Sequence, residues 1–458
     1  MQAQTFYMHT LPLSPASAAS NPLVIFWFRR DLRLPDNAGL QHALKSGFPV
    51  LPVFLLDPET LPWLTVPEDR RIPFLHQALT NLETELQRFG SSLLVKHGTP
   101  QTVFQELTHT YSVAAVYTNR DYEPATIARD QGLAEALNRQ GISFHTFKDH
   151  VIFEMQEVVK EEGTPYRVFG AYKRKWLQQL NPLSLQPYPT EPHTHAFFQT
   201  SPFPHPPLME SATEGIPVVF PAKVIQEEII RNYGLTKDIP ALEESTSRLG
   251  VHLRFGTVSI RQVARTAQSL SEAWFNQLIW RDFFAMLLFH FPHVAHTTFH
   301  RDYEAIPWSQ DEEHFARWCE GTTGYPLVDA GMRELNTTGF MHNRVRMVVA
   351  SFLVKHLLLD YRWGEAYFAE KLLDYDLATN NGNWQWCAGT GCDAAPYFRV
   401  FNPQTQAQRF DKQNQYIRKW VPEWGTPAYP APLVDHTWAR ERVVSTYKKA
   451  LALARYLP

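Results

Sequence analysis

The sequence predicts two domains of different class: an α/β domain with a doubly wound parallel sheet, followed by an all-α domain. Three observations predict this. The chain has 458 residues, more than one ordinary domain contains. Over the first 150 residues, short apolar runs alternate with helical segments. Beyond about residue 222, strand-like alternation nearly vanishes.

The N-terminal domain is predicted from short apolar runs separated by helical stretches. Such runs, when apolar throughout, are typical of strands buried on both faces of a parallel sheet. The expected strands lie at residues 23–28, 50–56, 92–95, 114–117 and 142–147. The expected helices between them lie at residues 72–89, 101–110 and 125–139. The first turn reads FRRDLRLPDN and lacks G-x-G-x-x-G, so no dinucleotide fingerprint is present.

Two stretches lack these patterns. Residues 1–22 have neither a basic start nor a continuous apolar run, so we expect a disordered extension rather than a signal peptide. Ten prolines fall between residues 181 and 221, which is typical of a connection between domains. The predicted organisation is an α/β domain at 23–150, an interdomain linker at 151–221 and a helical domain at 222–458.

The helical domain is predicted from segments of helical periodicity with turn signals between them. The expected helices lie at residues 222–232, 258–269, 273–289, 312–320, 327–337, 344–359 and 364–373. No internal repeat is visible, and no oligomerisation element, so we expect a monomer.

Composition excludes several classes of protein. Charged residues make up 19% and hydrophobic residues 44%, which excludes a disordered chain. A net charge of −3 argues against coating nucleic acid by charge alone, although a local basic face stays open. Three cysteines fit neither a disulfide framework nor a four-ligand zinc site, and favour reduced thiols in a cytoplasmic protein without a metal. No apolar run is long enough to predict a membrane span.

Two segments of the helical domain carry polar groups at places where ligands bind. The run TSRLG at 246–250 precedes a helix, where hydroxyl residues cap the helix or hold a phosphate. The run WFNQLIWRDFF at 274–284 places Trp274, Gln277 and Arg281 along one helical face. Most aromatic stripes at this spacing are core, but two Trp with an amide and an ion pair also suit a pocket.

Two further segments indicate a pocket more strongly. Gly339 is expected to end one helix, and His342 and Asn343 to open the next, which gives either a capped surface helix or an anion site. The run DYDLATNNGNWQW at 374–386 combines two carboxylates, three Asn and two Trp. A polar pocket for a planar heterocycle explains it better than a surface turn, and nearby His ligands for a metal are lacking.

Together these segments resemble the photolyase/cryptochrome family, and more narrowly the class I cyclobutane pyrimidine dimer photolyases. The resemblance runs from about residue 23 to residue 447. It is strongest in TGYPLVDAGMRELNTTGFMHNRVRM and DLATNNGNWQWCAGTGCDAAPYFRVFNP, and FWFRRDLRLPDN is similar to the N-terminal opening of the family. It implies a DNA photolyase that uses FAD and blue light to split pyrimidine dimers in UV-damaged DNA.

The resemblance also implies which residues bind FAD. Those expected around its phosphates and ribityl chain are Tyr233, Thr246, Ser247, Arg248, Leu249 and Gly250. Trp274, Asp374 and Asp376 are expected to line the flavin, with Arg346 paired to Asp374 near the isoalloxazine ring. Asn380 matches the residue that faces flavin N5.

A pocket for a flipped-out dimer is implied as well. Trp280 and Trp386 match its stacking walls. The implied catalytic residues are Gln277, Asn343, Asn380 and Met347. The implied substrate-binding residues are Gln277, Trp280, Arg281, Asn343, Arg344, Met347 and Trp386. The class that repairs (6-4) photoproducts carries paired histidines in this region, whereas here only His342 is present, which favours the dimer.

Three positions depart from the pattern of dimer photolyases, and one of them is Phe340, which stands where a Trp is common beside the helix start. Gln277 stands where these enzymes carry a Glu, and Gln cannot supply a proton. The chain of residues that reduces the flavin maps to Trp308, Tyr361 and Trp384, with Tyr361 in place of a Trp and a detour through Trp363 as an alternative. Gln277 and Tyr361 support a second hypothesis, a cryptochrome-like FAD photoreceptor that signals to a partner.

The antenna cofactor and the DNA-binding face are specified less closely. Residues 119–126 read NRDYEPAT, without the Asn-Glu pair that folate-binding relatives place after Tyr-Glu. A deazaflavin or flavin antenna is therefore favoured over folate, and the absence of any antenna remains an alternative.

For binding DNA phosphates we expect a local excess of positive charge, in which four cations outnumber one acid, Asp360. Its members are Arg344, Arg346, Lys355 and Arg362.

Overall fold

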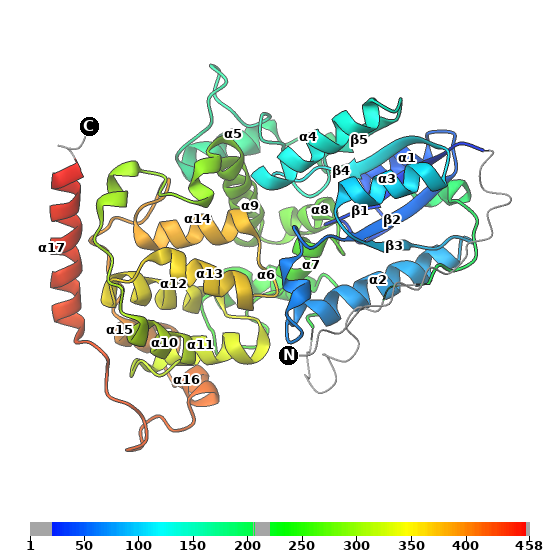
Figure 1. Ribbon diagram of the computed structural model, residues 1–458. Coiled ribbons are helices and arrows are strands. Elements are labelled where there is room, and N and C mark those ends of the chain that lie inside the picture. The colour runs from blue at the N-terminus through cyan, green and yellow to red at the C-terminus, as the bar shows by residue number, and fades with distance from the viewer. Residues whose placement is uncertain (1–20, 205, 207–219, 455–458) are drawn as a thin grey trace, which may run out of the picture.

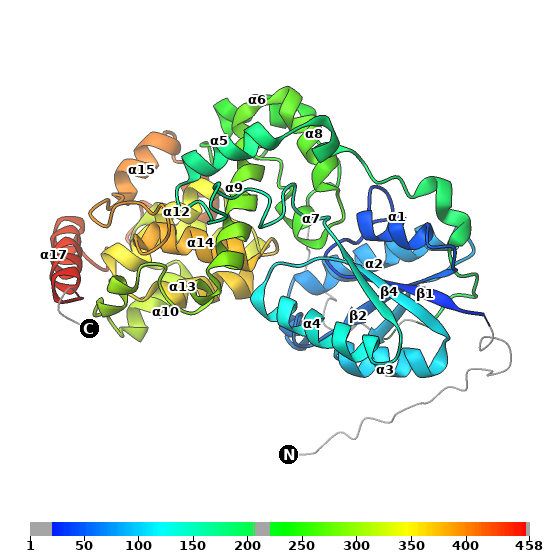
Figure 2. The same ribbon diagram turned by 90° about the horizontal axis from the view of Figure 1, so that it is seen from above.

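The computed structural model describes residues 21–204, 206 and 220–454. It consists of an α/β domain and a helical domain arranged side by side, with the C-terminal helix at the far end of the helical domain (Figures 1 and 2). The predicted fold class is confirmed. The predicted extension at residues 1–22 lies, except for its last two residues, outside the described residues.

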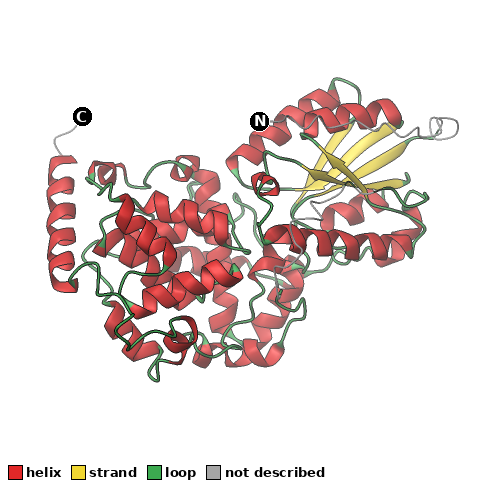
Figure 3. Cartoon of the chain, turned by 60° about the horizontal axis from the view of Figure 1, so that its bottom comes forward, coloured by secondary structure: helices red, strands yellow, loops and turns green. Residues whose placement is uncertain are grey.

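The N-terminal domain is built on one parallel sheet with the strand order β3-β2-β1-β4-β5 (Figure 3). Its strands are β1 (Leu23–Phe28), β2 (Val50–Leu56), β3 (Leu94–His97), β4 (Val113–Asn119) and β5 (Ser143–Phe147). The central strand β1 pairs with β2 and β4 and is buried along its whole length, which explains its unbroken apolar sequence. All five predicted strands are present: β1 and β2 have the predicted bounds, and the ends of β3, β4 and β5 are shifted.

Helices cover both faces of this sheet because successive side chains of a strand point to opposite sides. Val24, Phe26 and Phe28 of β1 pack on the face covered by α1 and α2. Ile25 and Trp27 pack on the face covered by α3 and α4. These helices are α1 (Ala38–Leu44), α2 (Arg71–Gln87), α3 (Pro100–Thr110) and α4 (Pro124–Asn138).

The helical domain packs its helices around two large apolar clusters, one centred on α9 and one on α11 and α12. Its helices are α6 (Glu227–Thr236), α7 (Gly250–Phe255), α8 (Ile260–Leu270), α9 (Glu272–His290), α10 (Glu312–Glu320), α11 (Pro326–Thr338), α12 (Asn343–Ser351), α13 (Tyr361–Lys371), α14 (Leu377–Ala388), α15 (Pro403–Phe410), α16 (Gln415–Trp420) and α17 (His436–Ala454). All seven predicted helices overlap one of these. The prediction missed α14, whose apolar periodicity is broken by polar residues, and it also missed α15, α16 and α17.

One predicted helix is wrong in its continuity. The sequence predicts a single helix at residues 344–359, but α12 ends at Ser351 and a π-helical turn follows at Phe352–His356. The wider turn directs Lys355 into the protein, where its Nζ donates to the carbonyl of Ala388 at 2.6 Å. Such a local change of helix type leaves no mark in hydrophobic periodicity.

The segment at residues 151–221, predicted as a linker, packs on both domains in its described part. It contains α5 (Phe169–Gln179), whose Tyr172 and Trp176 are buried in the core around α9. Farther along, Phe197 and Phe198 pack against the two faces of the sheet. The segment therefore holds the two domains together, and its limits stay a prediction.

A buried group of charges also joins the domains. The guanidinium of Arg261, on α8, contacts Asp149 at 2.8 Å and Asp36 at 2.8 Å. Arg33, in the turn after β1, contacts the other carboxylate oxygen of Asp149 at 2.7 Å. Burial opposes ionisation of Asp149, but the two arginines hold its pKa well below the usual range. The FRRDLRLPDN turn thus anchors the helical domain to the sheet.

Candidate active site

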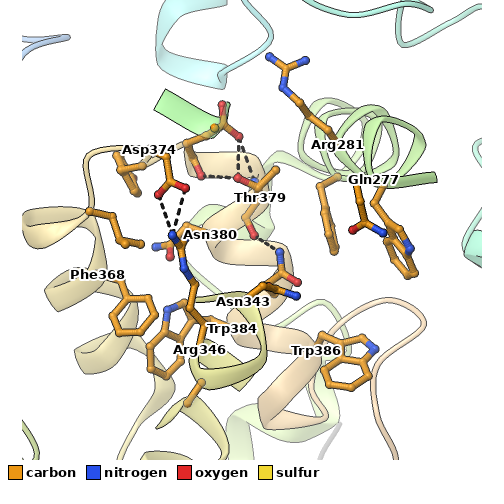
Figure 4. Close-up of a pocket in the computed structure, with 18 of the residues that line it drawn as sticks. Gln277, Arg281, Asn343, Arg346, Phe368, Asp374, Thr379, Asn380, Trp384 and Trp386 are labelled. Atoms are coloured by element: carbon orange, nitrogen blue, oxygen red, sulfur yellow. Dashed lines mark hydrogen bonds and ion pairs between the residues drawn. The ribbon is translucent and has the colours of Figure 1, made fainter. Parts of the chain in front are cut away.

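A cavity of about 410 Å³ opens into the helical domain. It lies between α7, α9, α12, α13 and α14. Figure 4 shows polar and aromatic side chains from these elements facing it. Its lining residues are Gly250, Leu253, Arg254, Gln277, Trp280, Arg281, Phe284, Asn343, Arg346, Met347, Ala350, Phe368, Leu372, Asp374, Tyr375, Asp376, Thr379, Asn380, Asn383, Trp384, Trp386 and Cys387.

Helix α14 forms one side of this cavity. It begins where the carboxylate of Asp376 accepts hydrogen bonds from the backbone N–H and the hydroxyl of Thr379, both at 3.1 Å. Asn380 and Trp384 are one turn apart on the face that lines the cavity. Gly382 allows α9 to approach, since a Cβ there would lie 2.1 Å from the ring of Phe284.

An ion pair crosses the floor of the cavity. The guanidinium of Arg346 donates to both carboxylate oxygens of Asp374, at 3.1 and 3.0 Å (Figure 4). Its Nε donates to the carbonyl of Met341 at 2.7 Å, so the guanidinium is fixed at two points. Gly250 leaves room for the carboxylate, because a Cβ there would lie 2.8 Å from Asp374 Oδ2.

Cations from both domains surround Asp376. Arg30, in the turn after β1, pairs with its carboxylate. Burial opposes ionisation of Asp376, but Arg30, Arg254 and Arg281 hold its pKa well below the usual range. The carboxylate that caps α14 is therefore charged, and it connects the cavity to the α/β domain.

Two indole rings form aromatic walls near the mouth of the cavity. Trp280 lies on α9 and Trp386 near the end of α14, and both line the cavity. The ring of Phe169 lies flat on Trp280, with ring centroids 3.5 Å apart and planes 7° from parallel. Gln277, one turn before Trp280, is exposed and bonds its own helix through Ala273 O at 3.2 Å.

Asn380 is held by a backbone contact. Its Nδ2 donates to the carbonyl of Glu365 at 3.0 Å, which leaves its amide oxygen free of that bond. Burial raises the pKa of the Glu365 carboxyl to about 7, although a hydrogen bond from Asn381 at 3.0 Å opposes the shift. A neutral amide and a carboxyl that is easily protonated therefore adjoin this part of the cavity.

A second cavity, of about 500 Å³, lies at the carboxyl ends of β1 and β2. Ligands of doubly wound sheets bind at this edge, where the strand order reverses. The guanidinium groups of Arg29 and Arg129 lie 4.8 Å from the ring of Trp27, and Trp63 lines the far side. Arg254 and Tyr375 line both cavities, so the two are neighbours.

Comparison with known proteins identifies the family. A family model described as the FAD binding domain of DNA photolyase matches residues 274–426, and one described as DNA photolyase matches residues 24–193. Together they span most of the chain. The chain belongs to the DNA photolyase family.

Relatives of this family agree along nearly the whole chain. Deoxyribodipyrimidine photo-lyases of Halobacterium salinarum and Vibrio cholerae are 37% and 38% identical, over 93% of this chain and 99% of each relative. A class III photolyase from Agrobacterium tumefaciens superposes with a TM-score of 0.82 and 31% identity, over 96% of this chain and 99% of that one. An archaeal photolyase from Sulfolobus tokodaii, solved with two FAD molecules, gives 0.78 and 35%, over 93% and 99%.

The helical cavity fits the FAD of this family. Its Arg346–Asp374 pair, Asp376, Gly250 and Asn380 all face one space, as the resemblance implies. The remaining predicted FAD residues do not line it. Tyr233, Leu249 and Trp274 are buried in the apolar cluster around α9, and Thr246, Ser247 and Arg248 lie in the turn before α7. Arg248 has φ +51° and its guanidinium lies 4.5 Å from the ring of Phe340.

Most of the predicted substrate residues also meet in this cavity. Gln277, Trp280, Arg281, Asn343, Met347 and Trp386 all line it. Arg344 is the exception. It points to Asp238, at 2.7 Å, and lies 4.4 Å from the ring of Phe410.

The expected cationic face for DNA is wrong at Lys355. This residue is buried beneath Ala388 and Tyr447, and burial lowers its pKa to about 7. Arg362 is paired with Glu304 at 2.7 Å and with Asp360 at 3.0 Å. The four side chains bind partners within the protein and do not form a cationic patch on its surface.

The predicted electron-transfer residues are only partly in contact. Trp308 and Tyr361 have ring centroids 6.5 Å apart. Trp384 contacts Trp318 at 6.2 Å and Phe368 at 5.0 Å; among the described residues, no ring contact joins it to Tyr361. Burial raises the pKa of Tyr361 above its usual range. The alternative through Trp363 leads from Trp318 over Phe315, with centroids 5.8 and 5.2 Å apart.

Sequence reasoning missed several lining residues. Arg254 follows Gly250 by four residues on α7 and so shares its face, a spacing that would have identified it. Thr379 is signalled by its position three residues after the cap Asp376. Leu253, Phe368 and Leu372 are apolar and carry no signal that separates a cavity wall from a core.

Two kinds of feature are absent from the described residues. None of their helices is both long and apolar enough to cross a lipid bilayer. In the same part of the chain, no group of three or more His, Cys, Asp or Glu side chains is arranged to hold a metal ion.

Proposed function

We propose that this protein uses light to repair cyclobutane pyrimidine dimers in UV-damaged DNA. One observation carries the proposal: the two indole walls, Trp280 and Trp386, line the same cavity as Asp374 and Asn380. A flipped dinucleotide between these walls would lie next to a flavin held at the ion pair. Aromatic walls suit this role because every base has a face to stack on.

In this proposal each side chain has a physical task. When bound, reduced FAD supplies the photoexcited electron that opens the cyclobutane ring and takes it back afterwards. The Arg346–Asp374 pair would orient the flavin, and the Asn380 amide would hydrogen-bond it. Asn343 and Gln277 hydrogen-bond the dimer through their amides, and Met347 contacts it through sulfur. Gln277 can donate a hydrogen bond but cannot supply a proton.

A second chromophore is proposed for the α/β cavity. About 500 Å³ at the carboxyl edge of the sheet, lined by Trp27 and Trp63, suits a tricyclic ring system. The two FAD molecules of the Sulfolobus relative support this proposal. A flavin or deazaflavin is favoured over folate, and its excitation would pass to the neighbouring helical cavity.

The test is repair by the reduced, FAD-loaded protein. An oligonucleotide containing one thymine dimer is illuminated with it, and recovery of the ultraviolet absorbance of the bases is followed, with a dark sample as control. Trp280→Ala should weaken dimer binding about 5- to 100-fold, the range of one lost stacking wall, whereas Trp438→Ala, which removes an exposed side chain of α17, should leave it unchanged. Absence of recovery with flavin and DNA both bound would refute the proposal.

A cryptochrome-like photoreceptor is the second candidate. It is supported by Gln277, which is exposed and bonded only to its own helix. A photoreceptor would reduce its flavin in light without repairing the oligonucleotide. Gln277→Glu separates the two: in a repair enzyme this variant keeps or raises the repair yield, and in a photoreceptor it leaves repair absent.

A further inference from the structure

The two aromatic walls stand on different helices, α9 and α14. The gap between them therefore depends on the residues that hold each ring in place. Trp280 on α9 is covered by Phe169, whose ring lies parallel to it at 3.5 Å. Its other ring neighbours, Phe283 and Phe284, have centroids 5.7 and 5.4 Å away. The position of Trp280 therefore depends on Phe169, which is the first residue of α5.

Phe169 is itself held by Asp393, more than two hundred residues away in sequence. Its backbone N–H donates to Asp393 Oδ2 at 2.9 Å. The residue before α5, Val168, makes no side-chain cap, so Asp393 caps this helix from outside its own segment. A second link runs beside it, from Cys392 Sγ to the carbonyl of Arg167 at 2.9 Å.

The loop that carries Asp393 returns to the other wall. It follows directly on α14, and the N–H of Ala395 donates to the carbonyl of Trp386 at 3.3 Å. Asp393 adopts φ +51°, a left-handed conformation that is costly for most residues and tolerated by Asp, Asn and Gly. A strained backbone is thus kept at the point where the loop turns its carboxylate toward Phe169.

We infer that Asp393 is a positioning residue that sets the gap between Trp280 and Trp386. It acts through Phe169 on one wall, and through its own loop on the other. The inference rests on the proposed function, since the gap is the space for the flipped dimer. A gap fixed before binding lowers the cost of ordering the walls around the substrate.

Two substitutions separate the carboxylate from the backbone conformation. Asp393→Gly keeps the positive φ and removes only the hydrogen-bond acceptor. Asp393→Asn keeps both the acceptor and the tolerance of positive φ. The FAD-loaded proteins are compared in the dark, by fluorescence anisotropy, on a dimer-containing oligonucleotide and on its undamaged counterpart.

Asp393→Gly is expected to weaken binding of the dimer about three- to tenfold, the range that one net hydrogen bond supports. Binding of undamaged DNA, flavin content and repair per bound complex should equal those of the parent. Asp393→Asn should restore dimer binding. In combination with Phe169→Leu, which removes the flat ring, the glycine substitution should add little, because both act on the same contact.

Asp311→Ala is the matched control. It removes a cap carboxylate that accepts from His314 N at 2.9 Å, at the start of α10. The inference is overturned if Asp393→Gly binds the dimer as the parent does, if the control weakens binding equally, or if the effects of Asp393→Gly and Phe169→Leu are additive. A parent that does not prefer the dimer at all would instead refute the proposed function.

Discussion

The cavity of the helical domain and the cavity of the α/β domain have similar volumes, about 410 and 500 Å³, but different linings. In the first, contiguous runs of sequence on α9, α12 and α14 supply both the charges and the aromatic walls. In the second, the lining comes from the ends of β1 and β2, from α4, and from Arg254, Ala369, Glu370 and Tyr375 of the other domain. A site made from contiguous runs can be identified in a sequence, whereas one made at a sheet edge depends on topology.

The two cavities also differ in how their charges are balanced. In the α/β cavity, two carboxylates hold two arginines together: Asp130 lies 2.7 Å from Arg29 and 2.9 Å from Arg129, and Asp57 lies 3.3 Å from Arg129. In the helical cavity, Asp374 is the acidic partner of Arg346. The helical cavity should therefore be more sensitive to the loss of a single carboxylate, and the following substitutions test this difference.

The largest effect is expected from Asp374→Ala. It leaves Arg346 unpaired inside the cavity, and removing one partner of such a pair costs about 3–5 kcal/mol. Affinity for FAD should fall about a hundredfold or more, measured as flavin absorbance per protein after dialysis. Glu423→Ala, which removes the partner of Arg333 outside both cavities, should keep its flavin. Equal flavin loss in both variants would mean that folding, and not the cavity, was affected.

Glu365→Gln tests the buried carboxyl group beside the helical cavity. Burial raises its pKa from 4.5 to about 7, so the folded state binds more protons than the unfolded state between these values. This carboxyl group should therefore withdraw on the order of 3 kcal/mol of stability as the pH rises through this window. The amide introduced by Glu365→Gln cannot ionise, so the stability of the variant relative to the parent should rise by that amount, measured by urea unfolding of both proteins from pH 4.5 to 8.

The exposed Glu370, paired with Lys371, offers the matched control. Glu370→Gln should retain the pH dependence of the parent. If Glu365→Gln also retains it, the buried carboxyl group is not the source. Loss of this contribution in Glu365→Gln alone would assign it to that group.

In the α/β cavity, filling the space with a bulky side chain should affect ligand binding more than removing one charge. Ala125 lines its rim, and a Trp in its place would occupy the space proposed for the second chromophore. Ala125→Trp should lose most of the antenna absorbance, while FAD content and repair under direct flavin excitation stay unchanged. Ala128→Trp, on the same helix but outside the lining, is the control. Loss of FAD in Ala125→Trp would contradict the independence of the two cavities.

The sequence predicted one of these cavities well and the other hardly at all. Twelve of the lining residues of the helical cavity were named from the family resemblance, and five of them lie in the run at 374–386, where Trp, Asn and Asp together are unusual for a core. The α/β cavity was not predicted, since Trp27 and Trp63 are indistinguishable in sequence from buried apolar residues. Lys355 was misjudged for a similar reason: its charge predicts exposure, and only the π-helical turn directs it inward.

The smallest effect is expected at Tyr361, which lies outside the lining of both cavities. Tyr361 can be oxidised only as its phenolic proton leaves, and burial raises the pKa of that proton. Tyr361→Trp removes this requirement and should speed photoreduction of oxidised FAD severalfold, timed in the absence of DNA.

Tyr367→Trp makes the same change beside Trp318, with a ring contact of 5.7 Å to it, and is the comparison for the first variant. If electrons reach Trp384 by way of Trp308 and the residue at 361, only Tyr361→Trp is faster than the parent. Acceleration by Tyr367→Trp alone would mean that the ring contact of 6.2 Å between Trp384 and Trp318 carries the electron instead. Electrons would then reach the helical cavity from α10 and α13, and not from the side of the aromatic walls Trp280 and Trp386.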